Sequence, residues 1–171
     1  TVPVGAGTTF IAAIQQDKIQ AGMTTEPTVS RLLKTNEARI LIDMRDVEKT
    51  KEALGGTYPA ASLYMDSGYV AKNKPVVQKL ANALVKALKF IDTHSGAEIT
   101  AKMPQSFYAA DKEGYIKALD DGKKMFTPDG VMPEGGPETV LAVLSAFSKN
   151  LQGKKLDLSK TYTTEFVKAA K

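Results

Sequence analysis

A glycine turn near the amino-terminal end of the chain, Gly5-Ala-Gly-Thr-Thr9, holds the residues best suited to ligand binding. Gly5 and Gly7 allow a close approach of the backbone, and Thr8 and Thr9 place hydroxyl groups beside the free N–H groups at the start of a helix. Such helix starts attract anions and polar groups. These four residues are therefore candidate ligand-binding residues. The alternative is that Thr8 caps the helix and the glycines only form a tight turn.

A second candidate group, Thr24 to Glu26, ends a short apolar stretch. The Glu26 carboxylate could accept a hydrogen bond from an amine, an amidine or a pyrimidine N–H group, and Thr25 lies beside it. The alternative role for Glu26 is an ion pair with Arg31 or Lys34. We predict that Thr25 and Glu26 bind ligand and that they share one crevice with the glycine turn.

The composition excludes several common kinds of catalytic site. The chain has no cysteine, which excludes thiolate nucleophiles and cysteine-ligated metals, and its one histidine, His94, follows a long amphipathic helix as an ordinary helix ending. A single histidine cannot build a histidine-rich metal site. We therefore expect a binding protein rather than an enzyme, with no catalytic residues, no metal and no cofactor.

The charge pattern also limits the partners. The net charge is +4, but the positive charge is mostly lysine spread along helix faces, and the three arginines are separated in the sequence. Nucleic-acid-binding proteins cluster arginine with stacking aromatic residues, so no nucleic-acid partner is expected. The sequence has no apolar run long enough to span a bilayer and no export signal, and we expect any such signal to lie upstream of Thr1.

The elements that must position these residues are expected to alternate between strands and helices. Residues 1–5 resemble the tail of a strand, the glycine turn opens a helix through Ile14, and residues 20–25 follow as a strand. Apolar runs predict further strands at 39–44 and 60–65, with Ser67 and Gly68 as a turn. The predicted fold class is α/β.

Helices are predicted over the rest of the chain, at 28–36, 46–54, 74–93, 96–103, 105–120, 138–150 and 164–170. The strongest is 74–93, in which Pro75 suits the first turn and the apolar residues recur at helical spacing. We expect this helix to pack on a sheet through Val77, Leu80, Leu84, Leu88 and Ile91.

Three stretches, 4–27, 68–88 and 157–167, resemble in order the second half of bacterial ABC-transporter solute-binding proteins of the nitrate/sulfonate/taurine and thiamine-pyrimidine-precursor type. The resemblance implies a periplasmic-binding-protein-like two-lobe fold (type II), represented by its C-terminal half, that closes by a hinge on a small organic anion or nitrogen-containing molecule. It also implies an ABC permease as partner and a periplasmic or other extracytoplasmic location. Where the family carries Asp after the first helix, this chain has Gln20, so no ligand role is assigned there.

On that resemblance, residues 1–38 are the remainder of lobe two, 39–57 the return crossover or hinge, and 58–171 the closing part of lobe one with C-terminal helices. Such a fragment is expected to associate with the missing N-terminal half or to form a domain-swapped dimer. Two other functions stay open. They are the ligand-sensing effector domain of a transcription regulator and, as an enzyme of the same fold, a pyrimidine-precursor synthase.

Overall fold

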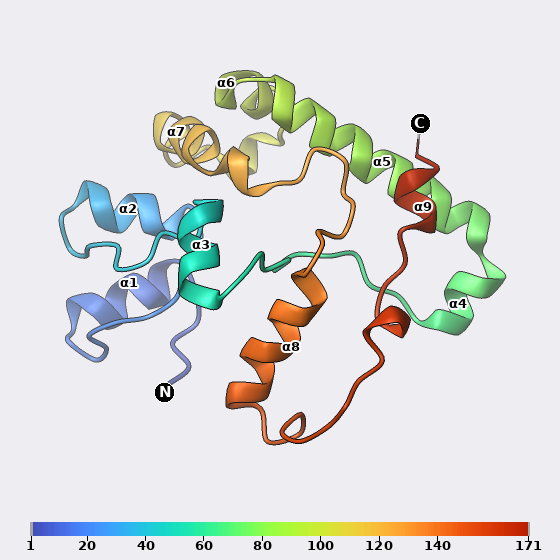
Figure 1. Cartoon of the computed structure of the whole chain (residues 1–171). Helices are drawn as coiled ribbons and strands as arrows, with labels where there is room; N and C mark the ends of the chain where they lie inside the picture. The colour runs from blue at the N-terminus through green and yellow to red at the C-terminus, as the bar shows by residue number, and fades with distance from the viewer. Residues whose placement is uncertain (1, 171) are drawn as a thin grey trace. The chain divides into compact units, whose positions relative to one another are not determined.

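The computed structural model describes residues 2–170, and every regular element in that range is helical (Figure 1). The chain divides into two compact units. Unit 1 comprises residues 2–41 and 94–122, and unit 2 comprises residues 42–93 and 123–170.

Unit 1 contains four α-helices and one 3-10 helix among the described residues: α1 (Thr8–Gln15), α2 (Thr28–Lys34), α6 (Gly96–Thr100), η1 (Gln105–Phe107) and α7 (Lys112–Gly122). Its small core joins α1 to α2 through Phe10, Ile11 and Leu32. Helices α6 and α7 are held close by Gly96, whose amide donates to the Asp120 carboxylate at 2.7 Å. An ion pair of 3.1 Å between Lys34 and Asp111 joins α2 to the start of α7.

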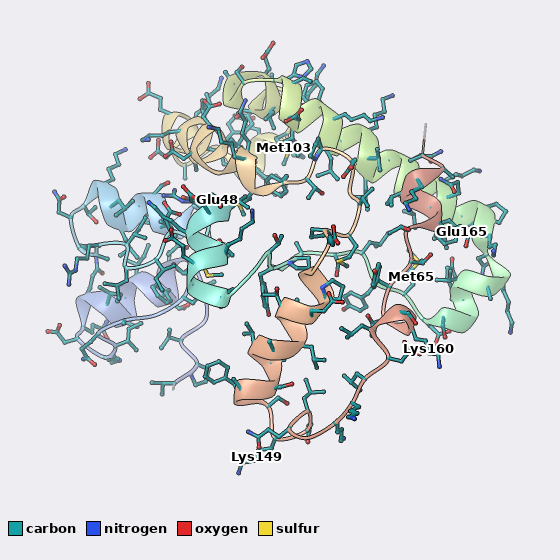
Figure 2. All side chains as sticks on the ribbon, viewed as in Figure 1. Glu48, Met65, Met103, Lys149, Lys160 and Glu165 are labelled. Carbon is teal, nitrogen blue, oxygen red and sulfur yellow. The ribbon has the colours of Figure 1, made fainter. Side chains whose placement is uncertain are left out.

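Unit 2 contains five α-helices and two 3-10 helices among the described residues: α3 (Val47–Leu54), α4 (Ser67–Lys72), α5 (Lys74–Thr93), η2 (Lys123–Met125), α8 (Gly136–Phe147), η3 (Leu158–Lys160) and α9 (Glu165–Lys168). Its core is formed where α9 packs on α5, through Phe166, Val77 and Ala81. The Glu165 carboxylate on α9 also pairs with Lys74 at 3.0 Å, and Figure 2 labels Glu165 at this position.

Short polar signals explain where the helices begin. Asp46 accepts hydrogen bonds from the amides of Glu48 and Lys49 at the start of α3, and Asp66 accepts one from Tyr69 at the start of α4. A capping box of Ser95 with Glu98 opens α6. These side chains satisfy amides that have no partner inside the helix.

The predicted α/β fold class, and with it the periplasmic-binding-protein-like two-lobe fold (type II), is wrong for this structure, whose regular elements in residues 2–170 are all helices. The segments expected as strands, 20–25, 39–44 and 60–65, are non-helical, and no strand forms among residues 2–170. A strand needs a neighbour to take its N–H and C=O groups, and the amides of 39–44 and 60–65 make no backbone hydrogen bond within the described chain. The apolar runs therefore give exposed segments rather than a sheet. Of the predicted strand at 1–5, Thr1 lies outside the described residues.

Most of the predicted helices are confirmed. The long helix is confirmed at Lys74–Thr93, and α1, α2, α3, α6, α8 and α9 occupy predicted regions. Two local interpretations are wrong. Ser67 and Gly68 open α4 instead of forming a turn, because Asp66 caps them, and the helix expected at 105–120 breaks into η1 and α7.

The buried face of α5 also differs from the prediction. Val77, Ala81 and Val85 are buried, whereas Leu80 and Leu84 are 41% and 47% exposed. The sheet expected to cover the leucines does not form, so α5 packs on α9 through the adjacent part of its apolar surface.

Candidate functional site

An open hollow of about 610 Å³ lies in unit 1, beside the glycine turn that precedes α1. Two non-helical segments line it, Val2–Gly5 and Lys18–Met23, and the Phe10 ring lies between them as the buried wall. Gly22 approaches this ring so closely that a Cβ atom there would lie 2.7 Å from two ring carbons. Glycine is thus required at this point by packing rather than by its backbone torsion angles.

The lining of the hollow combines apolar and polar residues. Val4 and Ile19 contribute aliphatic surface, while Lys18 and Gln20 supply an ammonium and an amide group. Among the described residues Lys18 forms no ion pair, and the Gln20 amide nitrogen donates to the carbonyl of Asp17 at 3.0 Å. An exposed cation beside an apolar surface suits a small anion that carries a hydrocarbon part.

Of the residues predicted in the glycine turn, only Gly5 lines the hollow. Its φ of +73° lies in the left-handed region, where glycine is strongly favoured. Gly7 precedes α1 with φ +63°, Thr8 is exposed and makes no capping bond, and the Thr9 hydroxyl donates to the Ala6 carbonyl at 2.9 Å. The turn is therefore built largely from bonds within itself.

The second predicted group lies just beyond the hollow. The Thr25 carbonyl accepts from the amide of Thr28, and the Glu26 carboxylate accepts from the amide of Ser30 at 3.1 Å, so both residues organise the start of α2. Neither lines the hollow, whose wall ends at Met23. Between them and that wall, the buried Thr24 hydroxyl has no hydrogen-bond partner within the described part of the chain.

Sequence reasoning missed Phe10 and Lys18 as site residues and set Gln20 aside. Phe10 is indistinguishable in sequence from any core residue of an amphipathic helix. Lys18 follows directly on Asp17, a non-glycine residue with φ +53°, and this bend places it on the hollow. Gln20 stands out in the sequence only as a departure from the resemblance, and no ligand role follows from that.

The described residues offer few other candidate sites. A second hollow of about 340 Å³ in unit 2 is lined by residues of the 131–138 region and by Tyr162, Thr164 and Lys168. Across residues 2–170 no group of histidine and acidic side chains is placed to hold a metal ion. Within the same range no helix is long and apolar enough to cross a membrane.

Comparison with solved structures gives one match, a protein structure from Bordetella bronchiseptica RB50. It is 34% identical in sequence, with a TM-score of 0.89, and the match covers 98% of this chain and 53% of the other. The chain thus spans about half the length of the structure it resembles. No family model matches the chain. A search of curated proteins finds no match either.

Proposed function

We propose that this chain is part of the solute-binding component of an ABC importer and that it holds a small organic anion in the hollow of unit 1. It captures the anion without converting it and passes it to a membrane permease, which would place it outside the cytoplasmic membrane. The resemblance of segments 4–27, 68–88 and 157–167 to such proteins supports the class of function.

The observation that carries the ligand class is the combination of Lys18 with the apolar wall around Phe10. A bare inorganic anion would leave the apolar wall without a partner, and a neutral apolar molecule would leave the ammonium without one. An aliphatic or aromatic carboxylate or sulfonate satisfies both. The Glu26 carboxylate accepts a hydrogen bond from the amide of Ser30, and Glu26 does not line the hollow. The proposed ligand therefore does not include an N–H group that donates to Glu26.

Isothermal titration of the 171-residue chain with a series of alkanesulfonates and aromatic carboxylates tests the proposal. We expect Lys18→Gln to weaken binding about fivefold, since a solvent-exposed ion pair contributes up to about 1 kcal/mol. Lys102→Gln, at an exposed lysine in unit 1 that does not line the hollow, is the matched control and should leave affinity unchanged.

Chain length in the ligand series provides a second test. Affinity should rise as methylene groups are added to the sulfonate, until the apolar wall is covered. Equal binding by wild type and Lys18→Gln, or tightest binding by nitrate, would contradict the proposed ligand class.

A further inference from the structure

The side-chain amide of Gln20 is oriented by a hydrogen bond on the hollow of unit 1. Gln20 lines this hollow, and its Nε2 atom donates to the Asp17 carbonyl at 3.0 Å. A carbonyl oxygen only accepts hydrogen bonds, so the amino group of the amide, and not its oxygen, must face Asp17. The Oε1 atom accepts no hydrogen bond within residues 2–170. One hydrogen-bond acceptor on the hollow is therefore available to a ligand.

The backbone that orients Gln20 is itself anchored to the end of α1. The Asp17 amide donates to the Ile14 carbonyl at 3.0 Å, and the Lys18 amide donates to the Ala13 carbonyl at 2.9 Å. These bonds fix the bend at Asp17, whose carbonyl then receives the Gln20 amide. The orientation of Gln20 is thus set by the free protein, so less side-chain ordering has to accompany ligand binding.

The groups around Gln20 limit the kind of donor that a ligand can bring to it. The Lys18 ammonium group lies on the same hollow, and no aspartate or glutamate lines it. A ligand ammonium group near Gln20 would meet a like charge without a carboxylate to compensate, which is unfavourable. A hydroxyl group can donate a hydrogen bond to Oε1 and carries no charge. The lining therefore favours a hydroxyl group over an amino group.

We propose that Gln20 is a specificity-determining residue of the hollow, and that it selects organic anions that carry a hydroxyl group. This role rests on the proposed function, in which Lys18 attracts the anionic group and the wall around Phe10 covers the hydrocarbon part. Gln20 accepts the hydrogen bond from the ligand hydroxyl through Oε1. The ligand class is then narrowed to hydroxylated alkanesulfonates and hydroxylated carboxylates.

Isothermal titration of the wild-type 171-residue chain with four related sulfonates tests this role. The ligands are propanesulfonate, its terminal hydroxy derivative, its terminal amino derivative and the isomer hydroxylated at the middle carbon. We expect at least one hydroxylated ligand to bind about threefold to tenfold more tightly than propanesulfonate, as for one added hydrogen bond. The amino derivative should bind more weakly than propanesulfonate, because of the Lys18 charge.

Gln20→Met removes the amide and keeps a side chain of similar length. The preference for the hydroxylated ligand should then fall to less than about twofold, while the affinity for propanesulfonate stays as in the wild type. Gln16→Met is the matched control, at an exposed glutamine directly after α1 that does not line the hollow. It should retain the full preference for the hydroxyl group.

The possible results separate this role from the proposed function. Binding of propanesulfonate with no gain from a hydroxyl group, or tightest binding of the amino derivative, would overturn the role of Gln20 and leave the proposed function in place. Equal weakening of all four ligands by Gln20→Met would show that Gln20 only shapes the segment, and would also overturn it. If the wild-type chain binds none of the four sulfonates, the proposed function fails and the role of Gln20 fails with it.

Discussion

Gly22 lies where the chain passes the Phe10 ring, and its missing side chain is what allows the hollow to close on that side. A methyl group there would overlap a ring that is only 4% exposed and cannot easily move. We predict that Gly22→Ala destabilises the chain by about 1–3 kcal/mol, the usual cost of overpacking. Chemical denaturation measures this, with the exposed neighbour Ala21→Ser as a control expected to stay within about 0.5 kcal/mol. Equal values for the two variants would contradict the packing shown for Phe10.

Asp43 and Arg45 form an ion pair just before α3, with 2.9 Å between Oδ2 and Nη2 and a second bond from Nε to Oδ1. The side-chain hydrogen bond from Arg45 lowers the pKa of Asp43 below its ordinary value of 3.8. The carboxylate therefore favours the folded state above pH 3.8, and this contribution is lost as the pH falls through the lower, folded-state pKa.

Asp43→Asn should accordingly cost about 1–2 kcal/mol at pH 7 and nothing once the carboxyl of the wild type is protonated. Unfolding of both proteins followed from pH 7 to pH 2 checks this, because the two stability curves should converge only below pH 4. A constant difference across that range would show that Asp43 acts through packing instead of charge.

At the scale of single residues, the sequence located one edge of the candidate site but not its chemistry. Gly5 was predicted and lines the hollow. This prediction was possible because a turn with positive φ favours glycine, so its position can be recognised from residue type. Thr25 and Glu26 were predicted from their place at the end of an expected strand, and they bond to the start of α2. Lys18 could not be found because its position depends on a bend at Asp17, which aspartate tolerates but which residue type alone does not predict.

At the scale of elements, α5 offers two neighbouring residues with opposite environments. Val85 is 3% exposed, whereas its neighbour Leu84 is 47% exposed. In the 171-residue chain we predict that Val85→Ala destabilises by about 1.5–3 kcal/mol, and that Leu84→Ala changes stability by less than about 0.5 kcal/mol. Thermal or urea unfolding of the two variants measures the difference. A larger loss at Leu84 would mean that this side chain is already covered in the chain alone.

The contrast between helices and strands explains which elements the sequence could predict. A helix satisfies its backbone within itself, so periodicity and caps suffice, and the bounds of α5 agree with its pattern. A strand depends on a neighbour that local sequence does not supply. The run Arg39-Ile-Leu-Ile-Asp-Met44 has the composition of a buried strand, yet Leu41 is 71% exposed and the run pairs with no segment in residues 2–170.

At the scale of the whole molecule, few apolar side chains are buried and many large apolar side chains are exposed among the described residues. The hydrophobic effect opposes such exposure at about 25 cal/mol per Å² of apolar area. The chain alone should therefore unfold with a smaller denaturant m value than a compact protein of its length, since less surface is newly exposed. Urea unfolding measures m, and a value typical of a compact 171-residue domain would indicate that the surface is buried in solution.

Hydrogen exchange of the 171-residue chain, read by mass spectrometry at low concentration, tests the central claim that its apolar non-helical segments are unpaired. The account predicts that the amides of residues 39–44 and 60–65 exchange within about tenfold of the rates of an unstructured peptide, while those inside α5 exchange far more slowly. Strong protection of both segments in a monomeric chain, comparable to that of α5, would contradict it. That result would mean that these segments already have backbone partners within the chain.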